Sequence, residues 1–111
     1  MSINFKNNSN WFSLDELIEE ELKEIENNMR KAVKVVQNEA KILCPVDTGR
    51  LRNSIVTGLE VQEDEIIGTI QTNVEYADIV HDGAGKRKPQ PFLKNAAENK
   101  EQEVLKILQG G

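Results

Sequence analysis

A single helical repeat of apolar residues fills the first half of this 111-residue chain and limits the folds open to it. Apolar residues recur from Leu14 to Leu43 about every 3.6 residues, which is the period of an α-helix. Pro45 ends the pattern, because the residue before a proline avoids the α conformation. A straight helix of this length measures about 45 Å, whereas a compact domain of this size is about 34 Å across. We therefore expect the helix either to pack on a neighbouring subunit or to kink near Asn27-Asn28.

The helix has a predicted start at Ser13. Ser13 and Glu16 have the spacing of a capping box, in which each side chain accepts a hydrogen bond from the other residue's backbone N–H. The preceding stretch is polar and rich in asparagine. We therefore predict a flexible N-terminal segment over residues 1–12 and a single domain over residues 13–109.

A small antiparallel sheet and a second helix are predicted after Pro45. Residues 55–62 and 66–74 are rich in residues that favour strands, and an acidic turn separates them, so they predict a β-hairpin. Pro91 and the apolar spacing after it predict a C-terminal helix. Short helical pieces are expected around Leu51 and Tyr76. The fold class is α+β, and the long helix should cover one face of the hairpin, because two strands alone are marginally stable.

Composition excludes several function classes. The chain has 19 acidic and 14 basic residues and a net charge of −5, which disfavours wrapping by nucleic acid. Cys44 is the one cysteine and His81 the one histidine, so neither an internal disulfide nor a Cys/His metal cluster is expected. We predict no cofactor and no metal. Cys44 is expected to be a buried structural thiol of a protein in a reducing compartment. No apolar run reaches the length of a membrane span.

The charges of the long helix are segregated. Seven acidic residues lie between Asp15 and Glu26, and the basic residues Arg30, Lys31 and Lys34 follow them. One interpretation is that the charges complement the helix dipole on a solvated face. The other is that acidic and basic parts of adjacent subunits attract each other.

The tripeptide Asp47-Thr48-Gly49 raises the alternative of a small dimeric aspartic protease, in which two carboxylates share a proton and activate water. The context argues against it, since that fold is nearly all-β and a long helix precedes the tripeptide here. The structural interpretation is a cap and a tight turn. No other arrangement of residues indicates a catalytic site, so we predict that the chain is not an enzyme.

A loop before Pro91 carries three consecutive cations, Lys86, Arg87 and Lys88. They fit a surface that contacts an acidic partner, and a second alternative is a nucleic-acid-binding module that uses this loop. The preceding glycines lack the spacing of a phosphate-binding loop.

The order of motifs along the chain resembles that of the small head–tail joining, or tail-completion, proteins of long-tailed bacteriophages and prophages. In that family a long helix is followed by V-D-T-G-x-L-x-x-S-I, a hairpin, a Tyr-Ala segment leading to a glycine, and P-F-L-x-x-A. The positions that match are Asp47, Thr48, Gly49, Leu51, Ser54, Tyr76, Ala77, Gly83, Pro91, Phe92 and Leu93. The chain departs from the pattern at His81, where glutamate is more usual, and at Ala84, where threonine is commoner.

The resemblance implies a non-enzymatic part of a virion that is assembled in the bacterial cytoplasm. Such proteins form a ring, usually of six copies, between the tail tube or its terminator and the head connector. DNA passes through the lumen of the ring without sequence-specific binding, and no membrane is involved. By this resemblance the segment from Asp47 to Leu51 fixes the junction between the helix and the hairpin, and Tyr76 and Phe92 pack that junction against the C-terminal helix. The loop of Lys86, Arg87 and Lys88 would face a partner.

Overall fold

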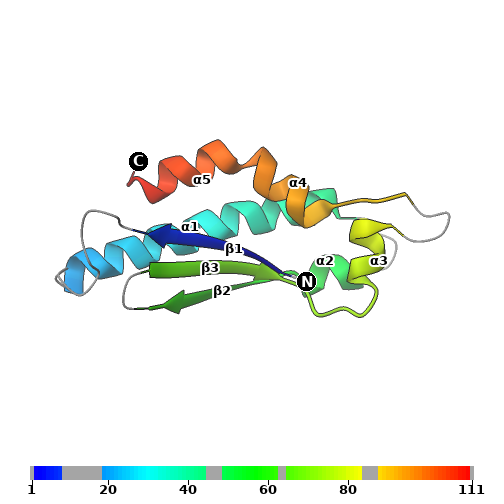
Figure 1. Ribbon diagram of the computed structural model, residues 1–111, viewed down its shortest axis with the longest axis horizontal. Helices are drawn as coiled ribbons and strands as arrows, with labels where there is room; N and C mark the ends of the chain where they lie inside the picture. Colours follow the sequence, from blue (N-terminus) through cyan, green and yellow to red (C-terminus); the bar gives the residue numbers. More distant parts are fainter. Residues whose placement is uncertain (1, 9–18, 45–48, 63–64, 84–87, 111) are drawn as a thin grey trace.

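The computed structural model describes residues 2–8, 19–44, 49–62, 65–83 and 88–110 (Figure 1). The described part is an α+β arrangement of a three-stranded sheet with helices packed on one side, which confirms the predicted fold class. In chain order the elements are β1 (Ser2–Asn8), α1 (Glu19–Leu43), α2 (Arg50–Ser54), β2 (Val56–Val61), β3 (Glu65–Gln71), α3 (Ala77–Asp82), α4 (Phe92–Asn99) and α5 (Glu101–Leu108).

The long helix ends where Pro45 predicts. α1 is unbroken from Glu19 to Leu43, and its 25 residues span about 37 Å. The alternative of a kink near Asn27-Asn28 is therefore wrong. The molecule measures 52 × 23 × 22 Å, so an elongated shape rather than a bend accommodates the helix. The predicted start at Ser13 lies outside the described residues.

The middle of the α1 stripe is enclosed by the chain itself, and the described ends of the stripe are less so. Met29, Ala32, Val36 and Ala40 are fully buried. Leu22 and Ile25 are half-buried, and Leu43 is exposed. The prediction that the stripe needs a neighbouring subunit is therefore wrong for its central turns, because the sheet, α4 and α5 cover them.

The predicted hairpin is confirmed as β2 and β3, and β3 is the central strand of the antiparallel order β1-β3-β2. β3 ends at Gln71 rather than at the predicted Val74. Ile66, Gly68 and Ile70 alternate along β3 on the face toward α1, because side chains in a strand point to opposite faces in turn. Gly68 lets α1 approach closely, since a Cβ there would lie 2.5 Å from Cγ1 of Val33.

The prediction of a flexible segment over residues 1–12 is wrong for its first part. Ser2–Asn8 form β1, which pairs with β3 in the register that places Ile3 opposite Ile70 and Phe5 opposite Gly68. Ile3 and Phe5 alternate with polar residues, so the period-two signal of a strand was present in this polar sequence. The pairing gives hydrogen-bond partners to the backbone groups along the edge of β3 that the hairpin alone leaves unpaired.

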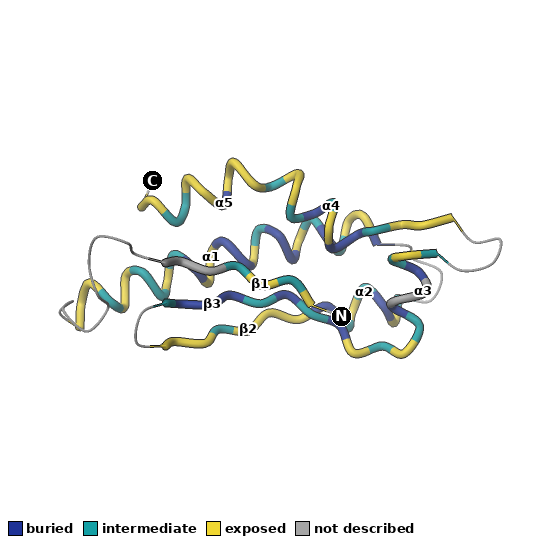
Figure 2. Tube along the Cα trace, viewed as in Figure 1, coloured by how far each residue is buried: buried dark blue, intermediate teal, exposed yellow. Residues whose placement is uncertain are grey.

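The predicted C-terminal helix is two helices. α4 and α5 meet at Lys100, whose backbone leaves the helical region with φ −106° and ψ 9°. Both helices contribute to the core, since α4 buries Phe92 and Leu93 and α5 buries Val104. Figure 2 shows the buried positions of α1, β3 and α4 facing one another, so the core lies between the sheet and the helices.

Candidate functional site

The segment from Gly49 to Ile55 is the described part of the V-D-T-G-x-L-x-x-S-I motif, and it lies between α1 and the hairpin in the chain. Gly49 has φ +73°, a left-handed conformation that favours glycine, and α2 begins directly after it. Leu51 is buried in the core. The Ser54 hydroxyl donates to the Leu51 carbonyl at 2.6 Å and is hydrogen-bonded to the hydroxyl of Thr72. The motif therefore ties α2 to the segment that follows β3.

Two side-chain hydrogen bonds fasten this junction to α1. Nε2 of the buried Gln37 donates to the carbonyl of Ile55 at 2.8 Å. Nε of Arg52 donates to the carbonyl of Lys41 at 3.0 Å, which satisfies an acceptor in the last turn of α1. Neither polar partner follows from sequence spacing, because each bond joins residues that are distant in sequence.

An exposed ion pair connects α2 to the segment before α3. The guanidinium of Arg50 donates to both carboxylate oxygens of Glu75, each at 2.9 Å, and lies 5.6 Å from the ring centre of Tyr76. The pKa of Glu75 is lowered by a hydrogen bond from its own backbone N–H and then by Arg50. The pKa of Arg50 is raised by its hydrogen bond to Glu75. The two-pronged geometry holds the orientation of α2.

The later family positions lie mainly in or beside the core. Ala77, Phe92 and Leu93 are buried, and Tyr76 is half-buried. Gly83 has φ +80° directly after α3, and Pro91 precedes α4. Asp47 and Thr48 lie outside the described residues, so their predicted role at the junction is not described.

His81 links α3 to the start of α4, a role that no sequence pattern predicts. Its Nδ1 lies 2.9 Å from a carboxylate oxygen of Asp82, and its Nε2 accepts the backbone N–H of Lys94 at 3.4 Å. Its ring packs edge-on against Phe92, with the ring centres 5.5 Å apart. His81 therefore provides a hydrogen-bond acceptor for a backbone N–H group in the first turn of α4, where helices have no acceptor of their own.

The structure describes only part of the predicted cationic loop. Lys88 is exposed, and Lys86 and Arg87 lie outside the described residues. The loop therefore remains a prediction as a partner contact or nucleic-acid site. The prediction of a buried thiol is confirmed, since Cys44 is buried and burial raises its pKa, an effect that the positive charge of Arg52 partly offsets.

Apolar side chains are exposed at three places on the described surface. Val56 and Val61 on β2 are 44 % and 46 % exposed, and Ile42 near the end of α1 is 71 % exposed. Leu43 and Leu105 are exposed as well. β2 is an outer strand, and among the described residues only β3 pairs with it. An outer strand with unpaired backbone groups is a template for another chain.

Within the described residues, no group of three or more His, Cys, Asp and Glu side chains is placed to hold a metal ion. No described helix is long and apolar enough to cross a membrane. The α+β fold, in which a 25-residue helix precedes Asp47-Thr48-Gly49, differs from the nearly all-β fold expected of an aspartic protease. In the described part of the chain, these features define a small α+β domain in which β1 and β2 are the outer strands of the sheet.

The amino-acid sequence of this domain matches a known protein family. The family described as "Bacteriophage HK97-gp10, putative tail-component" matches residues 12–83, which is more than half of the chain. The chain therefore belongs to this family of bacteriophage tail components, in agreement with the resemblance drawn from its motifs. Searches of curated proteins and of solved structures each found no match.

Proposed function

We propose that this chain is a non-enzymatic component of a phage or prophage virion whose copies assemble into a ring, six in number, between the tail tube and the head connector. The ring surrounds the path of the DNA without reading its sequence. The family match supports a tail component. The open outer edge of β2 is the observation that carries the assembly.

The edge of β2 favours contacts between copies. Val56 and Val61 would lose exposed apolar area if another chain covered them. An edge strand that is neither covered nor blocked by proline is a liability in an isolated protein, and β2 contains no proline. A contact made by β2 with a different surface of the next copy is heterologous, and repetition by a closing rotation gives a ring.

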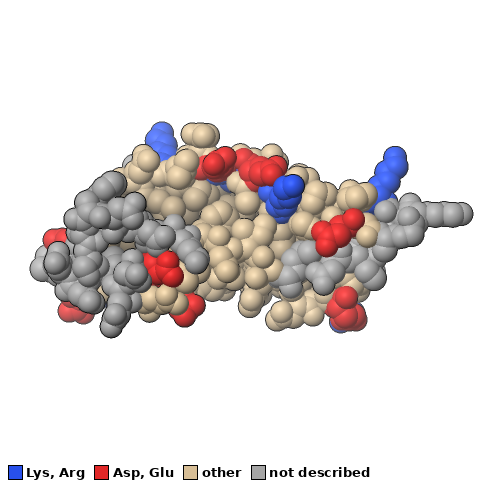
Figure 3. Space-filling model, in the orientation of Figure 1, with Lys and Arg blue, Asp and Glu red and all other residues tan. Residues whose placement is uncertain are grey.

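The outer face of the sheet also supports assembly. Thr69 pairs with Asn4 on one side and with Gly58 on the other, and the Thr69 hydroxyl donates to the Asn4 side-chain oxygen at 3.0 Å. This row is uncharged, and the neighbouring row of Ser2, Gln71 and Val56 is uncharged as well. Figure 3 shows that charged side chains are sparse across the middle of this face. The next row on this face holds the exposed Glu60 opposite Ile67, so a partner could cover only these two uncharged rows without burying charge.

The experiment is deletion of the gene for this chain from an inducible phage or prophage that encodes it. Electron microscopy of the lysate should show DNA-filled heads and separate tails, and expression of the intact chain in trans should restore joined particles. Joined, infectious particles in the absence of the chain would overturn the joining role.

A second measurement addresses the ring. Native mass spectrometry of the chain, alone and with its tail tube and connector partners, should reveal species that contain six copies of the 12.5 kDa protein. A single copy in every complex would contradict the ring while leaving the membership of the tail-component family intact.

A further inference from the structure

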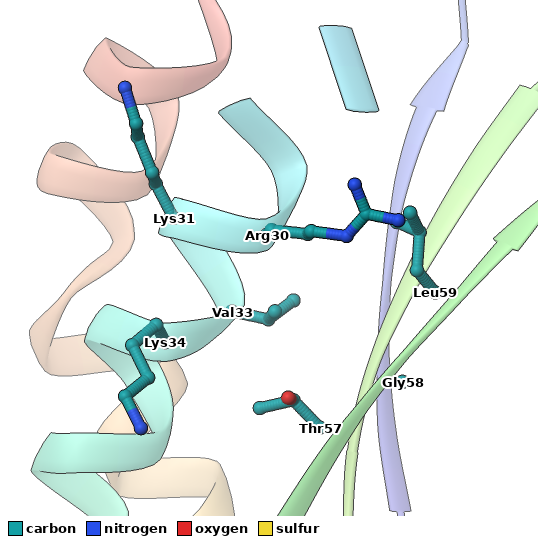
Figure 4. Close-up of a pocket in the computed structure, with 7 residues that line it drawn as sticks. All are labelled: Arg30, Lys31, Val33, Lys34, Thr57, Gly58 and Leu59. Atoms are coloured by element: carbon teal, nitrogen blue, oxygen red, sulfur yellow. The ribbon is translucent and has the colours of Figure 1, made fainter. Parts of the chain in front are cut away.

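A cationic groove lies between α1 and the outer strand β2. Its volume is about 460 Å³. The residues that line it are Arg30, Lys31, Val33, Lys34, Thr57, Gly58 and Leu59. Figure 4 shows Arg30 extending from α1 toward Leu59, with Lys31 and Lys34 on the helix beside the groove. The Arg30 side chain therefore reaches the β2 side of the groove, while Lys31 extends away from β2 and Lys34 extends along α1.

The positive charges of the groove are uncompensated by the described part of the chain. Arg30, Lys31 and Lys34 are exposed, and none of them forms an ion pair with a described carboxylate. Arg30 donates from Nη1 to the side-chain oxygen of Asn27 at 3.4 Å, which is a contact with a neutral group. The groove thus fits a negatively charged segment that lies along β2.

The chain itself carries a matching acidic surface on the first turns of α1. The described acidic residues of this surface are Glu19, Glu20, Glu21, Glu24 and Glu26. The one basic residue among them, Lys23, pairs with Glu19 at 3.4 Å. Glu20 and Glu24 are exposed and unpaired among the described residues. This acidic surface therefore has the sign and the exposure that the groove requires.

The two surfaces cannot meet within one copy. α1 is unbroken between them, so Glu20 and Arg30 stay about 15 Å apart along the helix axis. Because both surfaces belong to one continuous helix, they can pair with each other only between molecules. We infer that the groove of Arg30, Lys31 and Lys34 binds the acidic first turns of α1 from a second copy of this chain.

This inference rests on the proposed ring, and it names the contact that builds it. The acidic surface of one copy enters the groove of the next, so each copy uses two different surfaces, as a heterologous contact demands. The groove lies on the face of β2 that carries Thr57 and Leu59, and the exposed Val61 belongs to the same face. Charge attraction would set the direction of assembly, and apolar contact would contribute to its affinity.

The test is a charge swap. One variant carries Arg30→Glu and Lys34→Glu, and the other carries Glu20→Lys and Glu24→Lys. All four side chains are exposed, and circular dichroism verifies that each variant is folded. Each variant alone should lose self-association by about tenfold or more. An equimolar mixture of the two should regain it, because each groove then meets a surface of opposite charge.

Two controls accompany the swap. Lys94→Glu with Lys106→Glu makes the same change of charge on the exposed surface of α4 and α5, and it should leave association unchanged. Carbodiimide, which joins carboxylates to amines in direct contact, is applied to a mixture of unlabelled and ¹⁵N-labelled chain. It should yield mixed-isotope links between the 19–26 and 30–34 segments, even where association is weak.

The outcomes separate this inference from the proposed ring. If the chain forms its ring and the reversed variants form it equally well, the groove contact is overturned and the ring stands. If the groove variant loses binding to an acidic tail or connector protein but still self-associates, the occupant is that protein rather than a second copy. If joined particles form without the chain, the proposed function fails, and mixed-isotope links would still report the contact between copies.

Discussion

Gly68 on the central strand lies so close to Val33 of α1 that a Cβ at position 68 would be 2.5 Å from the Val33 Cγ1 atom. Val33 is β-branched and buried, so it cannot rotate away without disturbing the core. The distance between α1 and the sheet is thus set by the absence of a side chain at one position.

Gly68→Ala should therefore lower the free energy of unfolding by about 1–3 kcal/mol, the usual cost of overpacking a core. Urea unfolding followed by circular dichroism measures it. Gly58→Ala is the matched control on β2, where the nearest atom would be Cβ of Thr69 at an ordinary 3.9 Å. Equal stability of the two alanine variants would contradict the close approach of α1.

Gln37→Met should destabilise the protein by about 1 kcal/mol, because it removes the donor to the Ile55 carbonyl, a loss that removal of the buried and unpartnered Gln37 Oε1 partly offsets. Methionine keeps the length of the side chain, so the loss reports the hydrogen bond more than the packing. Asn38→Met, at the next and exposed position of α1, should change stability by less than about 0.5 kcal/mol. Thermal unfolding of both variants at one pH distinguishes them.

The carboxyl of Glu75 should titrate below the ordinary range for glutamate in the folded protein. Its own backbone N–H and then Arg50 favour the charged form, so its pKa is lower folded than unfolded. The resulting contribution to stability is present above the ordinary pKa of glutamate and disappears as the pH falls through the lowered value.

NMR titration of the side-chain carboxyl carbons measures this shift. In Arg50→Ala the midpoint for Glu75 should rise but remain lowered, because the backbone hydrogen bond persists. A midpoint that does not move in Arg50→Ala would show that the ion pair is not formed in solution.

Cys44 should react with iodoacetamide roughly tenfold or more slowly in the native protein than in denaturant. The thiol is buried and burial raises its pKa, so both access and the thiolate fraction are reduced. Mass spectrometry of timed samples gives the two rates, with free glutathione as the reference for an open thiol. Native labelling as fast as in denaturant would show that the end of α1 opens readily.

Local patterns predicted the elements that depend on neighbours in sequence. The 3.6-residue period and Pro45 predicted α1 and its end, and the strand-rich segments around an acidic turn predicted the β2–β3 hairpin. The motif that contains Gly49 predicted a turn that leads into a short helix. Periodicity and turn chemistry act within a few residues, so they can be read from the chain alone.

Tertiary structure decided the rest. β1 exists because residues 2–8 find the free edge of β3, some 60 positions away, and a polar strand gives only a weak local signal. The cationic groove likewise needs Arg30 and Lys34 beside Gly58, a placement that follows from packing α1 over Gly68. Sequence alone determined which segments could be helix or strand. Contacts between residues distant in the chain determined which surfaces were left for a partner, because burial and edge pairing are properties of the assembled core.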